Sequence, residues 1–231
     1  QRLESLPMAP ALPLAKDPGE VSEPKFQRRQ FKVEAAQWRA LKGRINDLGV
    51  TPTVFLLTMF SQVLSRWSKS SRFTLNLTLF NRLPMHEQVD LLVGDFTSLT
   101  LLEIEASSQH TLGQNAKRIQ AQLWDDLEYR YFGGVEVLRA LNRRSGSHHA
   151  VSMPVVFTSA LVLDRDEPEQ HGKVLESPAA LKVQDYGITQ TSQIWLDHVV
   201  REDKGALHLH WDAIEELFPA GLLDEMFAAY R

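Results

Sequence analysis

The 231-residue sequence contains no cysteine. This absence excludes disulfide bonds, zinc sites built from thiolates and a cysteine nucleophile. Because a chain without disulfides needs no oxidising compartment, we expect a cytoplasmic protein.

Concentrated positive charge is also missing. The formal net charge is −4, and the lysines and arginines are scattered along the chain. A surface that binds nucleic acid gathers lysine and arginine to neutralise phosphates. Nucleic acid is therefore not an expected partner.

Long apolar runs and a secretory signal are absent as well. No run approaches the ~18 residues needed to cross a bilayer. The first residues, Gln1 to Glu4, include neither an initiator methionine nor the start of a signal peptide. We therefore expect no membrane partner, and we interpret the sequence as part of a longer cytosolic polypeptide.

The sequence does have enough apolar residues for a core, after a proline-rich beginning. Hydrophobic residues make up 43% of the chain, which at this length allows a substantial core. Residues 1–25 contain five prolines, and prolines remove backbone donors and favour extended geometry. We predict a linker over residues 1–25 and one folded unit over residues 26–231.

Hydrophobic periodicity predicts strands and helices that interleave without a strict βαβ repeat. The expected strands are 26–33, 73–79, 98–105, 155–163, 193–200 and 206–211. The expected helices are 34–48, 52–67, 110–127 and 135–141, with a last helix from Pro219 and an exposed loop over 164–172. This order favours an α/β fold (α+β) with a mixed sheet covered by helices.

Three polar residues stand inside otherwise apolar strand sequences: Thr158, Ser159 and Asp197. Buried polar groups cost free energy unless they are paired, so together they indicate a site. Strand alternation sends Thr158 and Ser159 to opposite faces, so at most one of them meets Asp197. The same alternation groups Gln193 and Trp195 with Asp197. Ordinary hydrogen-bonding roles for these residues stay open.

Other motifs carry less information. His148 and His149 begin an acyltransferase-like His-His-x-x-x-Asp-Gly pattern, but Met153 and Pro154 stand at its Asp and Gly positions. The pattern therefore fails.

The remaining candidates suggest neither a metal nor a bound cofactor. His208 and His210 share a strand face, but no third metal ligand is evident. Asn81 and Asp95 stand at strand ends, where capping is the commoner role. Gly94 is isolated, so no phosphate-binding loop is predicted.

Several motifs resemble, in order, the heterocyclization domains of nonribosomal peptide synthetases. An early segment, with Leu6-Pro7 and Pro10 to Leu14, resembles that family's crossover between its two lobes. Ser192 departs from the family, which usually has proline there. The motifs that carry the resemblance are Thr51-Pro52 to Trp67, Gly94 to Leu102, Pro154 to Leu161, Gln190 to Asp197, Trp211-Asp212 and Phe218-Pro219.

The resemblance implies the second, C-terminal lobe of a V-shaped domain built from two chloramphenicol-acetyltransferase-like lobes. The expected partners are the N-terminal lobe, which carries the paired-aspartate motif, and upstream and downstream peptidyl carrier proteins. The lobe is expected to bind no cofactor, because the carriers deliver substrates on phosphopantetheine arms. The domain would condense an acyl thioester with carrier-bound Cys, Ser or Thr, and then cyclodehydrate the product to a thiazoline or oxazoline.

The resemblance also assigns roles to residues. Asp197 matches the acid/base of the cyclodehydration, and Thr158 matches a residue that orients the carboxylate or the intermediate. Asn81 and Ser159 match positions associated with cyclisation, and Gln193 and Asp95 match supporting positions. The isolated lobe is expected to be inactive.

Two alternatives remain. The lobe would be a non-catalytic module that docks carrier proteins, or a lobe of an ordinary amide-forming condensation domain. The cations proposed to meet an acidic carrier helix are Arg28, Arg29, Arg39, Lys42 and Arg44.

Overall fold

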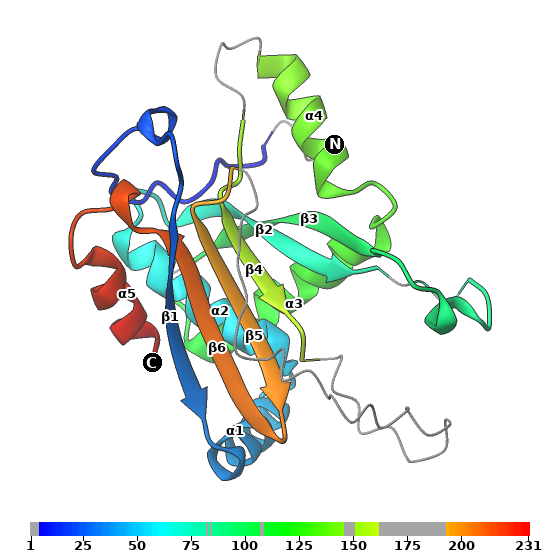
Figure 1. The fold of residues 1–231 in the computed structure, drawn as a ribbon. Coiled ribbons are helices and arrows are strands. Elements are labelled where there is room, and N and C mark those ends of the chain that lie inside the picture. Colours follow the sequence, from blue (N-terminus) through cyan, green and yellow to red (C-terminus); the bar gives the residue numbers. More distant parts are fainter. Residues whose placement is uncertain (1–4, 82, 84, 107–108, 146–150, 162–192) are drawn as a thin grey trace, which may run out of the picture.

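The computed structural model describes residues 5–81, 83, 85–106, 109–145, 151–161 and 193–231 (Figure 1). The strands are β1 (Phe26–Val33), β2 (Arg72–Phe80), β3 (Thr97–Glu105), β4 (Val155–Ser159), β5 (Leu196–Asp203) and β6 (Ala206–Ile214). The helices are α1 (Ala35–Asp47), α2 (Pro52–Trp67), α3 (Leu112–Glu128), α4 (Gly134–Ser145) and α5 (Leu222–Tyr230). Short 3-10 turns lie at Pro18–Glu20, Val89–Leu91 and Glu215–Leu217.

The strands form one six-stranded sheet in the order β1-β6-β5-β4-β2-β3. The short strand β4 runs parallel to both β2 and β5. The other neighbouring pairs are antiparallel. The predicted mixed sheet is therefore confirmed.

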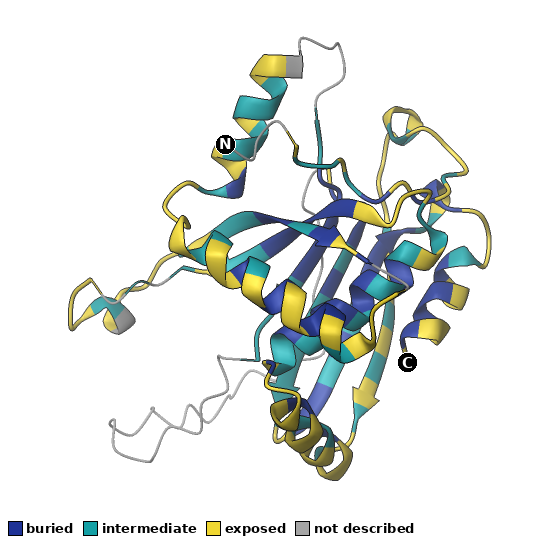
Figure 2. Cartoon of the chain, turned by 180° about the vertical axis from the view of Figure 1, so that it is seen from behind, coloured by how far each residue is buried: buried dark blue, intermediate teal, exposed yellow. Residues whose placement is uncertain are grey.

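Helices α1, α2, α3 and α5 lie against one face of the sheet (Figures 1 and 2). Helix α2 begins where the sequence predicts, because the Thr51 hydroxyl accepts the N–H of Val54 and Pro52 takes the first turn. Phe60 and Leu64 of this helix are fully buried. Figure 2, seen from behind, shows the buried sides of the helices turned toward the strands.

Among the described residues no single helix is long and apolar enough to cross a membrane. Helices α1 and α2 meet those limits only together, as a pair bent by 92°. Buried residues of α2 pack in the core of the molecule.

The start of β5 differs from the prediction. The strand begins at Leu196 and not at Gln193, because Gln193 has a φ of 68°. That left-handed conformation does not fit an extended strand. Gln193 is therefore exposed in a turn and does not share the strand alternation of Asp197.

The end of β4 is also earlier than predicted. The strand stops at Ser159, and the N–H of Ala160 still bonds to the carbonyl oxygen of Val200 at 2.8 Å. Residues 162–163 of the predicted strand and the predicted loop at 164–172 lie outside the described residues.

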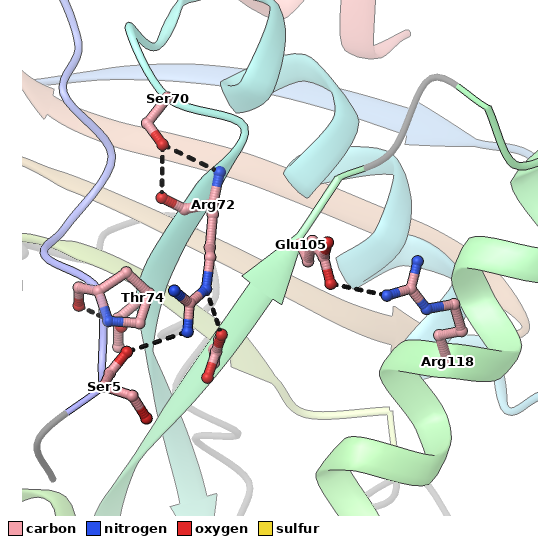
Figure 3. Close-up of polar contacts among 8 residues, drawn as sticks. Ser5, Ser70, Arg72, Thr74, Glu105 and Arg118 are labelled. Atoms are coloured by element: carbon pink, nitrogen blue, oxygen red, sulfur yellow. Dashed lines mark hydrogen bonds and ion pairs between the residues drawn. The ribbon is translucent and has the colours of Figure 1, made fainter. Parts of the chain in front are cut away.

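The proline-rich segment is attached to the sheet and not merely laid across a surface. The N–H of Thr74 donates to the carbonyl oxygen of Met8 at 2.9 Å, and the Thr74 hydroxyl donates to that of Pro7 at 2.6 Å. The Arg72 guanidinium donates to the carbonyl oxygen of Ser5 at 3.0 Å (Figure 3). Leu12 is buried in the core. The role of this segment as an inter-lobe crossover stays a prediction.

The centre of the covered face is an aromatic cluster around a buried histidine. His198 is completely buried and packs edge-on against Phe60, Phe157, Trp211 and Tyr230. Burial lowers its pKa to about 3, because no counter-charge compensates the desolvated imidazolium. The imidazole is therefore neutral near pH 7.

The hydrogen bonds of His198 define its tautomer. Its Nδ1 lies 3.1 Å from the carbonyl oxygen of His210. A carbonyl only accepts, so Nδ1 carries the proton. Nε2 is then an acceptor, and the Tyr230 hydroxyl at 2.9 Å donates to it. The Leu56 carbonyl oxygen, 3.3 Å from the same hydroxyl, is the longer contact.

The burial of His198 makes the stability of this fold depend on pH. An unfolded histidine binds a proton near pH 6.5, whereas His198 in the folded chain does so only near pH 3. Its contribution is therefore complete above pH 6.5 and is lost as the pH falls toward 3, by up to about 1.4 kcal/mol per pH unit. We expect His198→Gln to lower the slope of unfolding free energy against pH in this window, measured by urea denaturation.

The matched control is His86→Gln, because His86 is exposed. This variant should keep the wild-type slope. Equal slopes for the wild type and His198→Gln would contradict the neutral, buried imidazole.

Candidate functional site

The face of the sheet opposite helices α1, α2, α3 and α5 carries the predicted site, and we call it the site face. Alternation along β5 turns Leu196, His198 and Val200 toward the helices. Asp197 and Val199 therefore point to the site face.

Strand register extends this assignment across the sheet. Residues that are partners in register project from the same face. One row on the site face contains Arg28, Asp212, Asp197, Val156, Asn76 and Leu101. The next row contains Gln30, His210, Val199, Thr158, Thr78 and Leu99.

Asp197 lies in the middle of the first row, between Asp212 of β6 and Val156 of β4. Asp197 as a whole is partly exposed, while its Oδ1 atom is buried. The carboxyl group is therefore held in the wall of the sheet with one oxygen shielded from water.

A bidentate ion pair stands beside this carboxyl group. The Arg28 guanidinium donates from Nε to Oδ1 of Asp212 at 2.7 Å and from Nη2 to Oδ2 at 2.6 Å. Only 3% of the Asp212 side chain is exposed. The hydrogen bond to Asp212 and, more weakly, the charge of Asp197 raise the pKa of Arg28. One cation thus serves two carboxylates.

Thr158 shares the site face with Asp197, one strand away and two residues further along. From strand spacing and rise, their Cα atoms are about 8 Å apart. The Thr158 hydroxyl donates to Oγ1 of Thr78 on β2 at 2.9 Å. Its own oxygen keeps the capacity to accept a hydrogen bond.

Ser159 lies on the other face, as alternation predicts. Its Oγ is 2.8 Å from Oγ1 of Thr53 in the first turn of α2. The sheet therefore separates Ser159 from Asp197, and Ser159 connects β4 to the helix layer.

Asn81 lies near Asp95, because it bonds to the residue that follows Asp95. Neither residue lies near Asp197. The N–H of Asn81, directly after β2, donates to the carbonyl oxygen of Phe96 at 3.0 Å. Asp95 is exposed and accepts the N–H of Thr97 at 2.8 Å. Hydrogen bonds from the Thr97 side chain and backbone lower the pKa of Asp95. Asp95 thus caps the start of β3.

The spacing along β2 separates this corner from the central carboxyl group. Asn76 is in the same row as Asp197, and Asn81 comes five residues later, about 16 Å further along the strand. Gln193, exposed in its turn before β5, is not part of the rows either.

The two histidines of β6 do share the site face. Nε2 of His210 lies 3.9 Å from Oδ2 of Asp212, whose oxygens both accept from Arg28. Burial and the charge of Arg28 lower the pKa of His210 to about 4. In the part of the chain that the structure describes, no group of three or more His, Asp or Glu is arranged to hold a metal. His148 and His149 lie outside the described residues.

The cations considered for carrier docking are mostly engaged within the chain. Besides Arg28, Arg29 bonds Glu215 and Asp224, and Lys42 bonds Glu202. Arg39 and Arg44 are exposed on α1.

A hollow of about 720 Å³ lies on the helical side, away from the site face. Its lining includes Met59, Val63 and Trp67 of α2 and Glu105 at the end of β3. It does not include Asp197 or Thr158, so it is separate from the candidate site.

Thr78 and the pairing of Arg28 with Asp212 were not predicted from the sequence. Alternation in β2 places Thr78 opposite its apolar neighbours, but only the parallel pairing of β2 with β4 reveals its partner. The Arg28 pairing likewise needs the register of β1 against β6.

Known proteins resemble this chain over nearly its whole length. A family model described as Condensation domain matches residues 1–230. The chain is 37% identical over 226 residues to pyochelin synthetase PchF of Pseudomonas aeruginosa, covering 98% of the chain and 12% of that protein. It is 39% identical over 231 residues to phenyloxazoline synthase MbtB of Mycobacterium tuberculosis, covering 98% and 15%.

A solved structure is similarly close. The EpoB NRPS cyclization-docking bidomain from Sorangium cellulosum matches with a TM-score of 0.83 and 41% identity, over 99% of this chain and 45% of that one. This match confirms the predicted fold class. The chain spans less than half of the solved chain and a small part of the two synthetases.

The hydroxyl groups of Thr78 and Thr158 on the site face should contribute to stability in a coupled way. In a double-mutant cycle, Thr78→Val and Thr158→Val should show a coupling free energy of about 0.5–1.5 kcal/mol, because either change leaves a half-buried hydroxyl without its partner. Urea denaturation of the two single variants and the double variant measures this coupling.

Thr78→Val combined with Ser159→Ala is the control, since Ser159 points to the opposite face. Their effects should add. Additive effects for Thr78 and Thr158 would contradict the hydrogen bond on the site face.

Proposed function

The chain belongs to the condensation-domain family, and we propose that it is the C-terminal lobe of a heterocyclization domain of a nonribosomal peptide synthetase. The complete domain would join a carrier-bound acyl thioester to carrier-bound Cys, Ser or Thr. It would then close the new amide into a thiazoline or oxazoline. Its partners would be an N-terminal lobe and upstream and downstream peptidyl carrier proteins in the cytoplasm.

The names of the similar proteins support the cyclising branch. One is a phenyloxazoline synthase, and another is the cyclization part of a bidomain. Because this chain covers only a fraction of each, their activities come to it as a proposal.

The observation that carries the proposal is the position of Asp197 beside Thr158 on the site face. Amide formation needs mainly positioning, because a free amine already attacks a thioester. Cyclisation needs proton transfer as well, since the attacked amide carbonyl is a poor electrophile. A carboxyl group in a sheet wall, with one shielded oxygen and a cation nearby, is suited to that transfer.

The proposed cyclodehydration moves two protons. The substrate thiol or hydroxyl gives its proton to Asp197 and forms a C–S or C–O bond at the amide carbon. Asp197 returns this proton to the former carbonyl oxygen. That oxygen then leaves as water with the proton of the amide nitrogen, and a C=N bond forms.

Thr158 would orient the intermediate. Because its proton goes to Thr78, its oxygen is left to accept from the substrate amide N–H or from the protonated carboxyl group. Ser159 would act indirectly, through the contact of β4 with α2. Asn81, Asp95 and Gln193 would support binding from outside the central rows.

The proposal predicts a separation of two reaction steps. In the complete two-lobe domain, Asp197→Ala should still form the amide but should slow cyclodehydration by at least about 100-fold, because proton transfer is lost. Mass spectrometry of the carrier-bound product should show uncyclised amide, which is heavier by one water.

Asp203→Ala is the matched control, because Asp203 lies on the same strand and face as Asp197, six residues further along. It should cyclise normally. Normal loss of water in Asp197→Ala would refute the assigned role. A wild-type domain that releases only uncyclised amide would favour an ordinary condensation domain.

A further inference from the structure

Two carboxyl groups stand directly opposite one another at the centre of the site face. Asp197 of β5 and Asp212 of β6 are partners in the antiparallel register. Directly opposed residues have Cβ atoms about 5 Å apart, and two like charges in that position repel each other. Without a nearby positive charge to offset the repulsion, one of the two carboxyl groups keeps its proton.

The compensation comes from the next strand. Arg28 of β1 is the register partner of Asp212 and holds both of its oxygens at 2.7 and 2.6 Å. The three side chains together carry a net charge of −1 when both carboxyl groups are ionised. Arg28 thereby permits the full ionisation that the opposed carboxylates alone would resist.

Asp212 is firmly held by Arg28. The bidentate contact leaves Asp212 fixed in orientation and only 3% exposed. Asp197 lies nearer the middle of the sheet and is partly exposed. Asp212 therefore resists an added proton, since protonating it would disrupt two charge-assisted hydrogen bonds.

We propose that Arg28 and Asp212 are positioning residues that set the charge state of Asp197. Asp212 raises the proton affinity of Asp197 by repulsion, and Arg28 lowers it by attraction. Their balance keeps Asp197 able both to take up a proton and to release it. This inference deepens the proposed function and rests on it for its catalytic meaning, but the electrostatic coupling is a property of this chain alone.

The other groups near Asp197 do not supply the charges that Arg28 and Asp212 supply. His210 is neutral near pH 7, because burial and the charge of Arg28 lower its pKa to about 4. The raised pKa of Arg28 is consistent with its attraction to both carboxylates. On β4 and β2 the described neighbours in the two rows are uncharged. The other titratable or charged side chains that register and alternation place on this face are Lys32, Arg72, Glu103, Glu105, Arg201, Asp203 and His208.

The coupling is testable on the chain itself by carbon-13 NMR of labelled aspartate carboxyl groups during a pH titration. Arg28→Gln should raise the apparent pKa of Asp197 by at least about one unit, because repulsion by Asp212 is no longer offset. Asp212→Asn should lower it, because Arg28 then attracts Asp197 alone. Arg28→Lys keeps the charge and should restore most of the wild-type value.

Arg29→Gln is the matched control. Arg29 is the adjacent residue of β1 and bonds Glu215 and Asp224, so its loss also breaks ion pairs. This variant should leave the titration of Asp197 unchanged. Shifts in opposite directions for Arg28→Gln and Asp212→Asn establish the coupling, and no shift in Asp212→Asn overturns it even if Arg28→Gln fails to fold.

The complete two-lobe domain separates this inference from the proposed function. The acidic limb of the pH profile of cyclodehydration should move with the Asp197 titration, upward in Arg28→Gln and downward in Asp212→Asn. Titration shifts with an unmoved rate profile would support the coupling and refute the catalytic role of Asp197. Unchanged titrations of Asp197 would refute the coupling. The catalytic role of Asp197 would then be decided by the Asp197→Ala experiment.

Discussion

The parallel pairing of β4 with both of its neighbours is the constraint on which the rest of the structure depends. β4 has only five residues, yet in the strand order it joins β6, β5 and β1 on one side to β2 and β3 on the other. Its register aligns Val156 with both Asn76 and Asp197 and brings Thr158 to Thr78. A slip of one residue would send Thr158 to the helical face and Ser159 to the site face.

Consecutive residues of β5 lie in opposite surroundings, because they project from opposite faces of the sheet. His198 is kept neutral by an aromatic cluster under the helices. Asp197, the preceding residue, faces the row that contains Asp212 and Arg28. The helical layer therefore holds the sheet rigid from one side, while the other side presents polar groups in defined rows. This division explains how a stable core and the proposed proton-transfer site occupy the same strands.

Local patterns in the sequence predicted much of the fold. The span of β1 matches its prediction, and α2 begins at its capping Thr51 and Pro52, because these signals act through near neighbours. The start of β5 was missed, since the positive φ of Gln193 leaves no mark in an alternating pattern. The sequence placed Asp197 and Thr158 in apolar strands, but it did not predict that these strands are neighbours, and it did not predict Thr78 or the pair of Arg28 with Asp212.

The sequence by itself determined which segments alternate, which helices have caps, and that Thr158 and Ser159 must point in opposite directions. These follow from the period of two in a strand and from hydrogen bonds within a few residues. Only the tertiary structure decided which hydroxyl shares a face with Asp197 and which cation stands near it. Those contacts join residues 80 positions apart in Thr78 and Thr158 and 184 apart in Arg28 and Asp212. They depend on strand order and register, which are settled when the whole core packs and not by any short stretch of chain.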